Sequence, residues 1–354
     1  MSKNIVLALI LVFLQGCIGS KSITVDEKEI ANRKNLVEAN PDYYLEFIGL
    51  KNYSAQDIVD LLKASQNENT IIPQPLYACS ALMESKLGFE ATSTVHVNSN
   101  FGLISVVENE EEYGIIKYSF PADTLDTINE WNAPEVSLND RNNYNSLGFL
   151  SQFIRSDGEK LYMKYKAIYK MVAEDHEKEF RNNFFAHINS LNTPDNYEKA
   201  RETLKKDGNQ INRIWALLIL ATTKPTQEDL QVQFQEILGP SDYNSTLAST
   251  LMLTHIKLID TVNWELYKEE VKSILSGGAL WRYDENLKLL LENNFPADLA
   301  QEVFTDQSPV FLDRLNSYHK QAYETPFKLI KMMSENEVKT REEAINWVTA
   351  LYDK

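Results

Sequence analysis

Apolar positions in the first third of the chain recur mostly at helical spacing. Residues 55–88 contain two such stretches, and Ile58, Leu61 and Leu62 form the apolar stripe of the first one. Ser54 precedes this stretch and is suited to cap a helix, because its hydroxyl accepts a bond from a backbone N–H of the first turn. The pattern therefore predicts two helices, the second beginning near Pro73 and running to Ser85.

A different pattern follows the second helix. Residues 97–103 form an Asn-rich turn that leads into a β-favouring run at 103–107. A polar loop at 108–114 separates this run from a second short apolar stretch at 115–118. This arrangement predicts a β-hairpin made of 103–107 and 115–118, followed by another helix from Pro121.

The second half of the chain consists of helix-length amphipathic blocks separated by turn formers. These blocks are residues 211–222, 227–238, 245–258, 264–275 and 286–292. Helix pairs of this length and spacing resemble an α-solenoid of the HEAT type, with a plain helical bundle as the alternative. Such stacks usually bind a protein partner through an extended face. We expect the tryptophans of this half to belong to the core; they are Trp215, Trp264, Trp281 and Trp347.

The chain begins with a short apolar segment that ends at a cysteine. Lys3 precedes an unbroken apolar run at 5–14, which is too short to span a membrane as a mature anchor. The ending Leu14-Gln15-Gly16-Cys17 resembles the lipobox of bacterial lipoprotein signal peptides. The resemblance implies that residues 1–16 are removed and that Cys17 carries acyl chains such as palmitate. We therefore expect a protein of the cell envelope, lipid-anchored to a membrane on the periplasmic or surface side.

Composition narrows the classes of function. The net charge of −16 becomes −17 without Lys3, and an acidic chain of this kind is not expected to bind nucleic acid. Besides Cys17 only Cys79 remains, in an apolar helical stretch where a buried thiol is expected. The five histidines are scattered, and the chain contains neither a CxxC nor an HExxH motif. We expect no metal and no cofactor.

Two stretches of polar or turn-forming residues mark boundaries in the mature chain. Residues 18–40 are polar with few large apolar side chains, and together with Cys17 they are expected to form a tether at 17–40. Turn formers cluster again at 189–196. The sequence therefore predicts one domain at 41–188 and a second, helical domain at 189–354.

One acidic residue stands out for its position. Glu84 ends an otherwise apolar helix and is followed by Ser85 and Gly88. An acid that emerges from an apolar helix is where a carboxyl with a raised pKa would serve as a general acid. The solvated end of a helix is the alternative for an isolated glutamate.

The order of motifs around Glu84 resembles the bacterial N-acetylglucosaminidase domain of flagellar muramidases and autolysins. The matching pieces, over roughly residues 55–170, are Ile72-Pro73, Glu84-Ser85 with Gly88, Asn98 to Leu103, and Tyr118 with Asp123-Thr124. The resemblance implies a mainly α, lysozyme-like domain with a small β-hairpin beside a substrate groove. It also implies cleavage of peptidoglycan glycan strands after N-acetylglucosamine, with Glu84 as the general acid.

The resemblance assigns further residues to substrate binding: Ser85, Asn100, Phe101, Gly102 and Tyr118. Phe101 and Tyr118 would stack on sugars, with core packing as an equal alternative. A second carboxylate would come from the loop that holds Glu108, Glu110, Glu111 and Glu112, although a solvated acidic turn also explains these residues.

The chain departs from the family in three places. Ile104-Ser105 follow the Asn-rich turn, where the family often has a basic residue. Lys86-Leu87 stand where the family usually has Gly-Trp, and no tyrosine is in register at 153–158, which leaves Tyr144, Tyr162 or Tyr165 as spatial substitutes. Two functions follow. One is an anchored endo-β-N-acetylglucosaminidase, which we expect in the first place. The other is a non-catalytic lipoprotein scaffold that binds cell-wall glycan or a protein.

Overall fold

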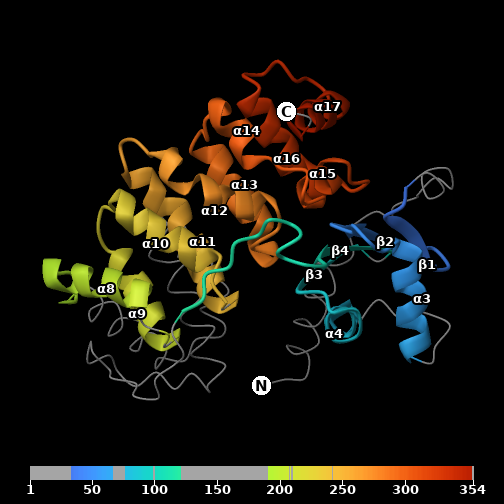
Figure 1. Ribbon diagram of the computed structural model, residues 1–354, viewed down its shortest axis with the longest axis horizontal. Coiled ribbons are helices and arrows are strands. Elements are labelled where there is room, and N and C mark those ends of the chain that lie inside the picture. Colours follow the sequence, from blue (N-terminus) through green and yellow to red (C-terminus); the bar gives the residue numbers. More distant parts are fainter. Residues whose placement is uncertain are drawn as a thin grey trace, which may run out of the picture.

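The computed structural model describes residues 33–66, 76–98, 100–120, 190–206, 208, 210–240 and 242–352. Several sequence predictions fall outside these residues: the expected signal peptide, Cys17, Ile72-Pro73, Asp123-Thr124, the helix expected from Pro121 and the three candidate tyrosines. The described part is mainly helical, as predicted, and has one small sheet (Figure 1).

The sheet has four strands in the order β1-β2-β4-β3. The strands are β1 (Leu36–Asn40), β2 (Tyr43–Ile48), β3 (Ala91–Asn98) and β4 (Phe101–Val107). The β1–β2 and β3–β4 pairs are antiparallel hairpins, whereas the central strands β2 and β4 run parallel. The parallel pairing requires a crossover between β2 and the second hairpin. Two helices, α3 (Ala55–Gln66) and α4 (Leu76–Leu87), lie in that connection.

Both faces of β4 are covered. Ile104 and Val106 pack in one cluster with Ile58 and Cys79 of the two crossover helices. Leu103 and Val107, on the other face, belong to the large core of the helical half. Every residue of β4 is consequently buried, which is why its sequence is a continuous apolar run instead of an alternating one.

The first crossover helix begins where the sequence predicts, and both crossover helices pack through the predicted apolar positions. The Ser54 hydroxyl accepts the Asp57 N–H at 3.2 Å, and the Asp57 carboxylate accepts the Ser54 N–H and hydroxyl, which is a reciprocal cap. Ile58 and Leu62 are buried in α3, as are Cys79 and Met83 in α4. Burial raises the pKa of the Cys79 thiol to about 11, so this thiol is protonated and inert at neutral pH.

The helical half forms a body of stacked helices. Its α-helices are α8 (Pro194–Lys206), α9 (Gln210–Leu220), α10 (Gln227–Ile237), α11 (Asp242–His255), α12 (Lys268–Leu275), α13 (Tyr283–Glu292), α14 (Ala300–Val303), α15 (Val310–Leu315), α16 (Lys320–Met333) and α17 (Arg341–Tyr352). Short 3-10 turns η1 (Ile256–Leu258), η2 (Trp264–Tyr267), η3 (Leu280–Arg282) and η4 (Ala297–Leu299) connect several of them.

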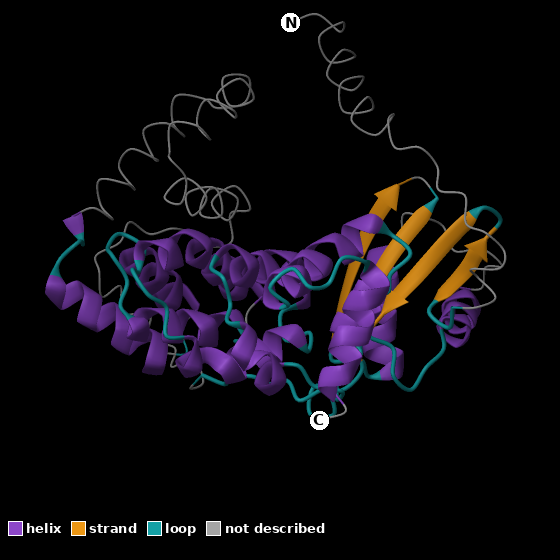
Figure 2. Cartoon of the chain, turned by 90° about the horizontal axis from the view of Figure 1, so that it is seen from above, coloured by secondary structure: helices purple, strands orange, loops and turns teal. Residues whose placement is uncertain are grey.

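The helices of the body stack in two rows. Helices α9, α11, α13 and α16 contact one another in succession, and so do α8, α10, η2, α12 and α14. The stack extends from α8 and α9 at one end to α15, α16 and α17 at the other, where the sheet stands against it (Figures 1 and 2). The five helical blocks predicted in this half are all helical in the structure.

An extended segment crosses from the sheet onto the helical body. We call residues 113–120 the strap. It leaves the turn after β4 and runs along the helices towards α9 (Figure 1). The backbone N–H of Ile116 donates to the Ser273 hydroxyl at 2.9 Å, and the Tyr118 N–H donates to the Leu238 carbonyl at 3.3 Å. Phe120 ends the strap with its ring against the Arg213 guanidinium, 3.2 Å from the ring centre.

Several sequence predictions are wrong in this region. The partner of 101–107 in the hairpin is β3, not 115–118, which is extended but pairs with no described strand. The Asn-rich turn is the tip of that hairpin, and its first strand was missed. Residues 36–40, expected to belong to the tether, form β1. Trp281 is 48% exposed, whereas Trp215 and Trp264 are buried as expected.

The end of β2 depends on a glycine. Gly49 has φ +95°, and a Cβ added there would lie 2.3 Å from the Val106 carbonyl oxygen and 2.9 Å from Val310 Cγ2. Gly88 also has a positive φ, of +72°, but nothing lies within 4 Å of its added Cβ. A side chain at Gly88 would thus cause backbone strain alone, whereas one at Gly49 would cause both backbone strain and a steric clash.

We predict that Gly49→Ala lowers the free energy of unfolding more than Gly88→Ala does. Backbone strain alone should cost roughly 1–2 kcal/mol at Gly88, and the clash should add roughly 1–3 kcal/mol at Gly49. Urea unfolding of both variants measures the difference. Equal losses would show that β4 and α15 both shift easily enough to admit the extra methyl group.

Candidate functional site

Glu84 lies in the last turn of α4, beside β3. Its side chain is exposed, and its Oε1 accepts a hydrogen bond from the Thr92 hydroxyl at 2.7 Å. The neighbouring Ser85 is also exposed, and its hydroxyl donates to the Leu82 carbonyl at 3.4 Å within the same helix. The structure thus brings Glu84 against the hairpin but leaves it in solvent, whereas general acids in glycosidases are kept protonated by an apolar pocket.

The residues of the Asn-rich turn are parts of the sheet. Phe101 is fully buried, and its ring packs against Tyr318 and His319, with centroid distances of 6.2 and 5.6 Å. Gly102 is buried within β4, opposite Leu45 on one side. The Asn100 carbonyl accepts the Tyr44 N–H at 2.9 Å. These three substrate-binding candidates therefore join the hairpin to β2 and to the helical body.

The acidic loop after β4 is tied to its own surroundings. The Glu108 carboxylate is buried and accepts bonds from the backbone N–H of Lys51 at 2.8 Å and from the backbone and side-chain nitrogens of Asn52. Glu110 forms an ion pair with Lys117 of the strap. Glu111 and Glu112 are exposed in the turn that follows. Glu108 therefore holds the loop after β2, and the remaining acids form a solvated turn.

Tyr118 belongs to the strap. Its hydroxyl donates to Glu270 Oε1 of α12 at 2.7 Å. Burial, together with the bond to this carboxylate, raises the pKa of the Tyr118 phenol above its ordinary value. The ring is half-buried on the helical body. Tyr118 and Glu84 thus lie in different parts of the fold. Tyr118 attaches the strap to α12, whereas Glu84 lies on α4, beside the sheet.

The most connected position is one that sequence analysis did not single out. The Gly49 N–H donates to Asp313 Oδ2 of α15 at 2.9 Å, and the Gly49 carbonyl accepts the Tyr113 hydroxyl at 2.5 Å. Lys51 Nζ donates to the carbonyls of Glu112 and Gln307, each at 3.2 Å. We call residues 49–52 the joint, because they connect the sheet, the strap and the helical body.

A second buried carboxylate supports the same interface. Glu46 of β2 is fully buried, and it accepts bonds from the Ser317 hydroxyl at 2.5 Å and from the Tyr318 N–H at 2.8 Å. Burial raises its pKa, against the opposing effects of these donors and of Arg33. An acidic residue in the middle of an apolar strand was the only sequence signal for this contact, and its partners lie some 270 residues away.

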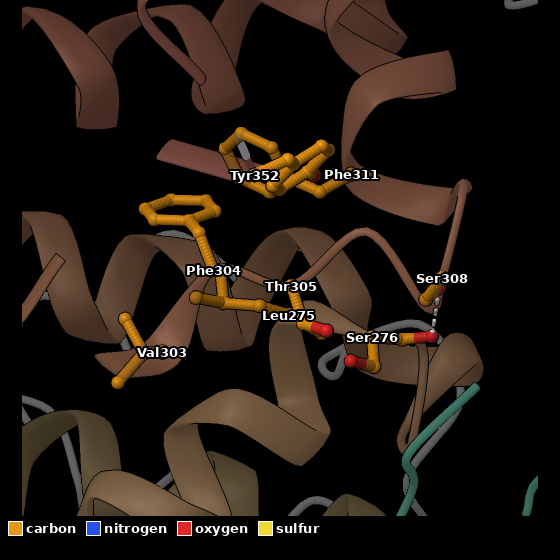
Figure 3. Close-up of a pocket in the computed structure, with 8 residues that line it drawn as sticks. All are labelled: Leu275, Ser276, Val303, Phe304, Thr305, Ser308, Phe311 and Tyr352. Carbon is orange, nitrogen blue, oxygen red and sulfur yellow. Dashed lines mark hydrogen bonds between the residues drawn. The ribbon is translucent and has the colours of Figure 1, made fainter. Parts of the chain in front are cut away.

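Two cavities lined by described residues bear on the question of a substrate site. One, of about 10 Å³, lies under α15 and is lined by Leu275, Ser276, Phe304 and Tyr352 among others (Figure 3). The Ser308 hydroxyl donates to the Ser276 carbonyl at its edge, at 2.7 Å. A space of this size holds about one water molecule, so it excludes a substrate.

The other cavity is open and measures about 310 Å³, beside the first turns of α8 and α10. Arg201 lies in it and is held by Asp229, at 2.9 Å, and by Glu198, at 2.7 Å. The positive charge of the Arg201 guanidinium is thus already neutralised by these two carboxylates. Neither Glu84 nor Ser85 lines either cavity.

No metal centre or membrane span is evident in the part of the chain that the structure describes. No group of three or more His, Cys, Asp or Glu side chains there could hold a metal ion. Among the same residues, no helix has both the length and the apolar character needed to cross a bilayer. Comparison with protein-family models, with curated proteins and with solved structures finds no significant match to this chain.

The burial of Phe101 leads to a direct test of its role. We predict that Phe101→Ala lowers the free energy of unfolding by roughly 3–5 kcal/mol, because it leaves a cavity between the hairpin and the helical body. Ser85→Ala, at an exposed position, should change it by less than about 0.5 kcal/mol. Denaturant unfolding provides both values. A Phe101→Ala protein of unchanged stability would identify Phe101 as a surface residue free to stack on a ligand.

Proposed function

We propose that this chain is a lipid-anchored, non-catalytic scaffold of the cell envelope that binds a protein partner through its helical body. The observation that carries the proposal is that most residues of the glucosaminidase-like motifs stabilise the fold. Phe101, Gly102, Glu108 and Tyr118 all have structural tasks in the sheet, the joint or the strap. The residues that resemble a glucosaminidase site in the sequence therefore lie in separate structural elements of the fold.

The surroundings of Glu84 support this choice over catalysis. Glycoside cleavage needs a protonated carboxyl beside the leaving oxygen and a second group, across the sugar, to manage the developing positive charge. Glu84 is exposed, and the carboxylate of Glu108 is occupied by three nitrogen donors.

The organisation of the helical body supports partner binding. Its two rows of successive helices are what a HEAT-like solenoid would present, and we propose this architecture for residues 194–352. Ion pairs connect neighbouring helices of one row: Lys205 to Glu228 at 2.5 Å, and Lys268 to Glu302. A rigid stack of this kind offers a long surface at little conformational cost on binding.

The anchor determines where such a scaffold acts. With acylated Cys17 in a membrane, the chain from Cys17 to Leu36 spans at most roughly 60–70 Å when fully extended. Leu36, where β1 begins, therefore stays within that distance of the bilayer. Only partners of the envelope, or the cell wall near the membrane, are accessible to the protein.

A second candidate is the anchored endo-β-N-acetylglucosaminidase. One observation favours it: the carboxylate of Glu84 does project from the end of α4 towards the β3–β4 hairpin, where it accepts the Thr92 hydroxyl. The enzyme would require Glu84 as general acid, with peptidoglycan glycan strands as substrate.

Digestion of purified cell wall separates the two functions. We predict that lipid-free protein releases no new reducing ends at any pH from about 4 to 8, and that Glu84→Gln behaves the same. Unfolding curves of both proteins serve as the control for folding. Release by the unmodified protein that disappears in Glu84→Gln would overturn the scaffold and establish the glucosaminidase.

The anchor has its own test. We predict that Cys17→Ala abolishes incorporation of labelled palmitate, because no other cysteine precedes the fold. Cys79→Ala, at the buried cysteine, should incorporate the label as the unmodified protein does. Label on the Cys17→Ala protein would mean that the chain is acylated at another residue.

A further inference from the structure

Asp313 occupies an unusual place in the interface between the sheet and the helical body. It lies on α15, and its Oδ2 accepts the N–H of Gly49, where β2 ends. No described cation pairs with it: the next residue, Arg314, directs its guanidinium to Asp284 and to the Ser105 hydroxyl, each at 3.1 Å. A carboxylate at an interface thus has one neutral donor and no counter-ion.

The other charged groups around Asp313 do not compensate for it. Glu46, from β2, adds a second negative charge to the same interface. The phenols of Tyr113 in the strap and Tyr352 in α17 also lie near enough to Asp313 to be affected by its charge. Two other described cations of this interface act elsewhere: Arg33 acts on Glu46, and Lys51 is bonded to the carbonyls of Glu112 and Gln307.

We propose that Asp313 makes the joint pH-sensitive: uptake of a proton by this carboxyl tightens the contact between the sheet and the helical body, and loss of the proton loosens it. The contact concerned is the one that positions Gly49, and through Tyr113 also the strap. The proposal does not depend on whether the protein is a scaffold or an enzyme.

The direction of the effect follows from linkage. Burial, reinforced by Glu46 and only partly opposed by the Gly49 N–H, raises the pKa of Asp313 from 3.8 to about 7. The folded state therefore holds this proton more tightly than the unfolded chain does. The stabilisation is fully present below about pH 4 and is lost as the pH rises through about 7.

The local readout is the backbone amide of Gly49, which donates directly to Asp313. We expect its ¹H–¹⁵N chemical shift in the full, lipid-free chain to titrate with a midpoint near neutrality. Its hydrogen-exchange protection factor, corrected for intrinsic rates, should rise up to roughly 100-fold between pH 8 and pH 5, if opening the joint exposes Asp313 fully. A Gly49 signal that does not change between pH 5 and pH 8 would overturn the proposal without any variant.

Asp313→Asn provides the complementary experiment, because an amide oxygen still accepts the Gly49 N–H but carries no charge. We expect a higher unfolding midpoint than that of the unmodified protein at pH 8, and a flatter pH dependence from pH 5 to pH 8. Asp298→Asn, which removes the same charge at an exposed site, should keep the unmodified pH dependence. If Asp313→Asn keeps it as well, or if both variants lose it equally, Asp313 is not the sensor.

Discussion

The joint at residues 49–52 is the contact on which the rest of the structure depends. Its four residues follow the end of β2 and form hydrogen bonds with the segment after β4, with the loop before α15 and with α15 itself. The close approach of Gly49 to Val106 and Val310 leaves no space for a side chain. Because these partners come from three distant parts of the sequence, the position of the sheet depends on its contacts with the helical body.

Buried charge explains how this interface is specific as well as tight. Apolar contacts such as those of Leu103 and Val107 favour burial of the sheet face but do not define its register against the helices. Glu46 does define it, since its carboxylate must meet the Ser317 hydroxyl and the Tyr318 N–H to offset the loss of water. Arg213 and Glu236 form a similar buried pair under Phe120, at the far end of the strap.

The helices were largely predictable and the strands only in part. Apolar spacing and local caps, such as Ser54 with Asp57, depend on residues within one or two turns, so α3, α4 and the helices from 210 to 292 follow from local sequence. β3 was missed because its residues, Ala91 to Asn98, are more often polar than apolar, and their pairing with β4 supplies the missing preference. Residues 115–118 have strand-like composition but bind helix side chains instead.

The sequence by itself determined the lipobox-like ending at Cys17, the acidic character, the helical spacing and the continuous apolar run of β4. Each of these depends on residues that are adjacent or a few positions apart. Only the tertiary structure decided the tasks of Phe101, Glu108 and Tyr118. A phenylalanine, a glutamate or a tyrosine suits a binding groove and a folded interior equally well, and what distinguishes the two is which distant atoms surround it. Phe101 packs against Tyr318, Glu108 accepts a bond from the Asn52 side-chain amide, and Tyr118 donates to Glu270. These contacts make the three residues part of the folded framework.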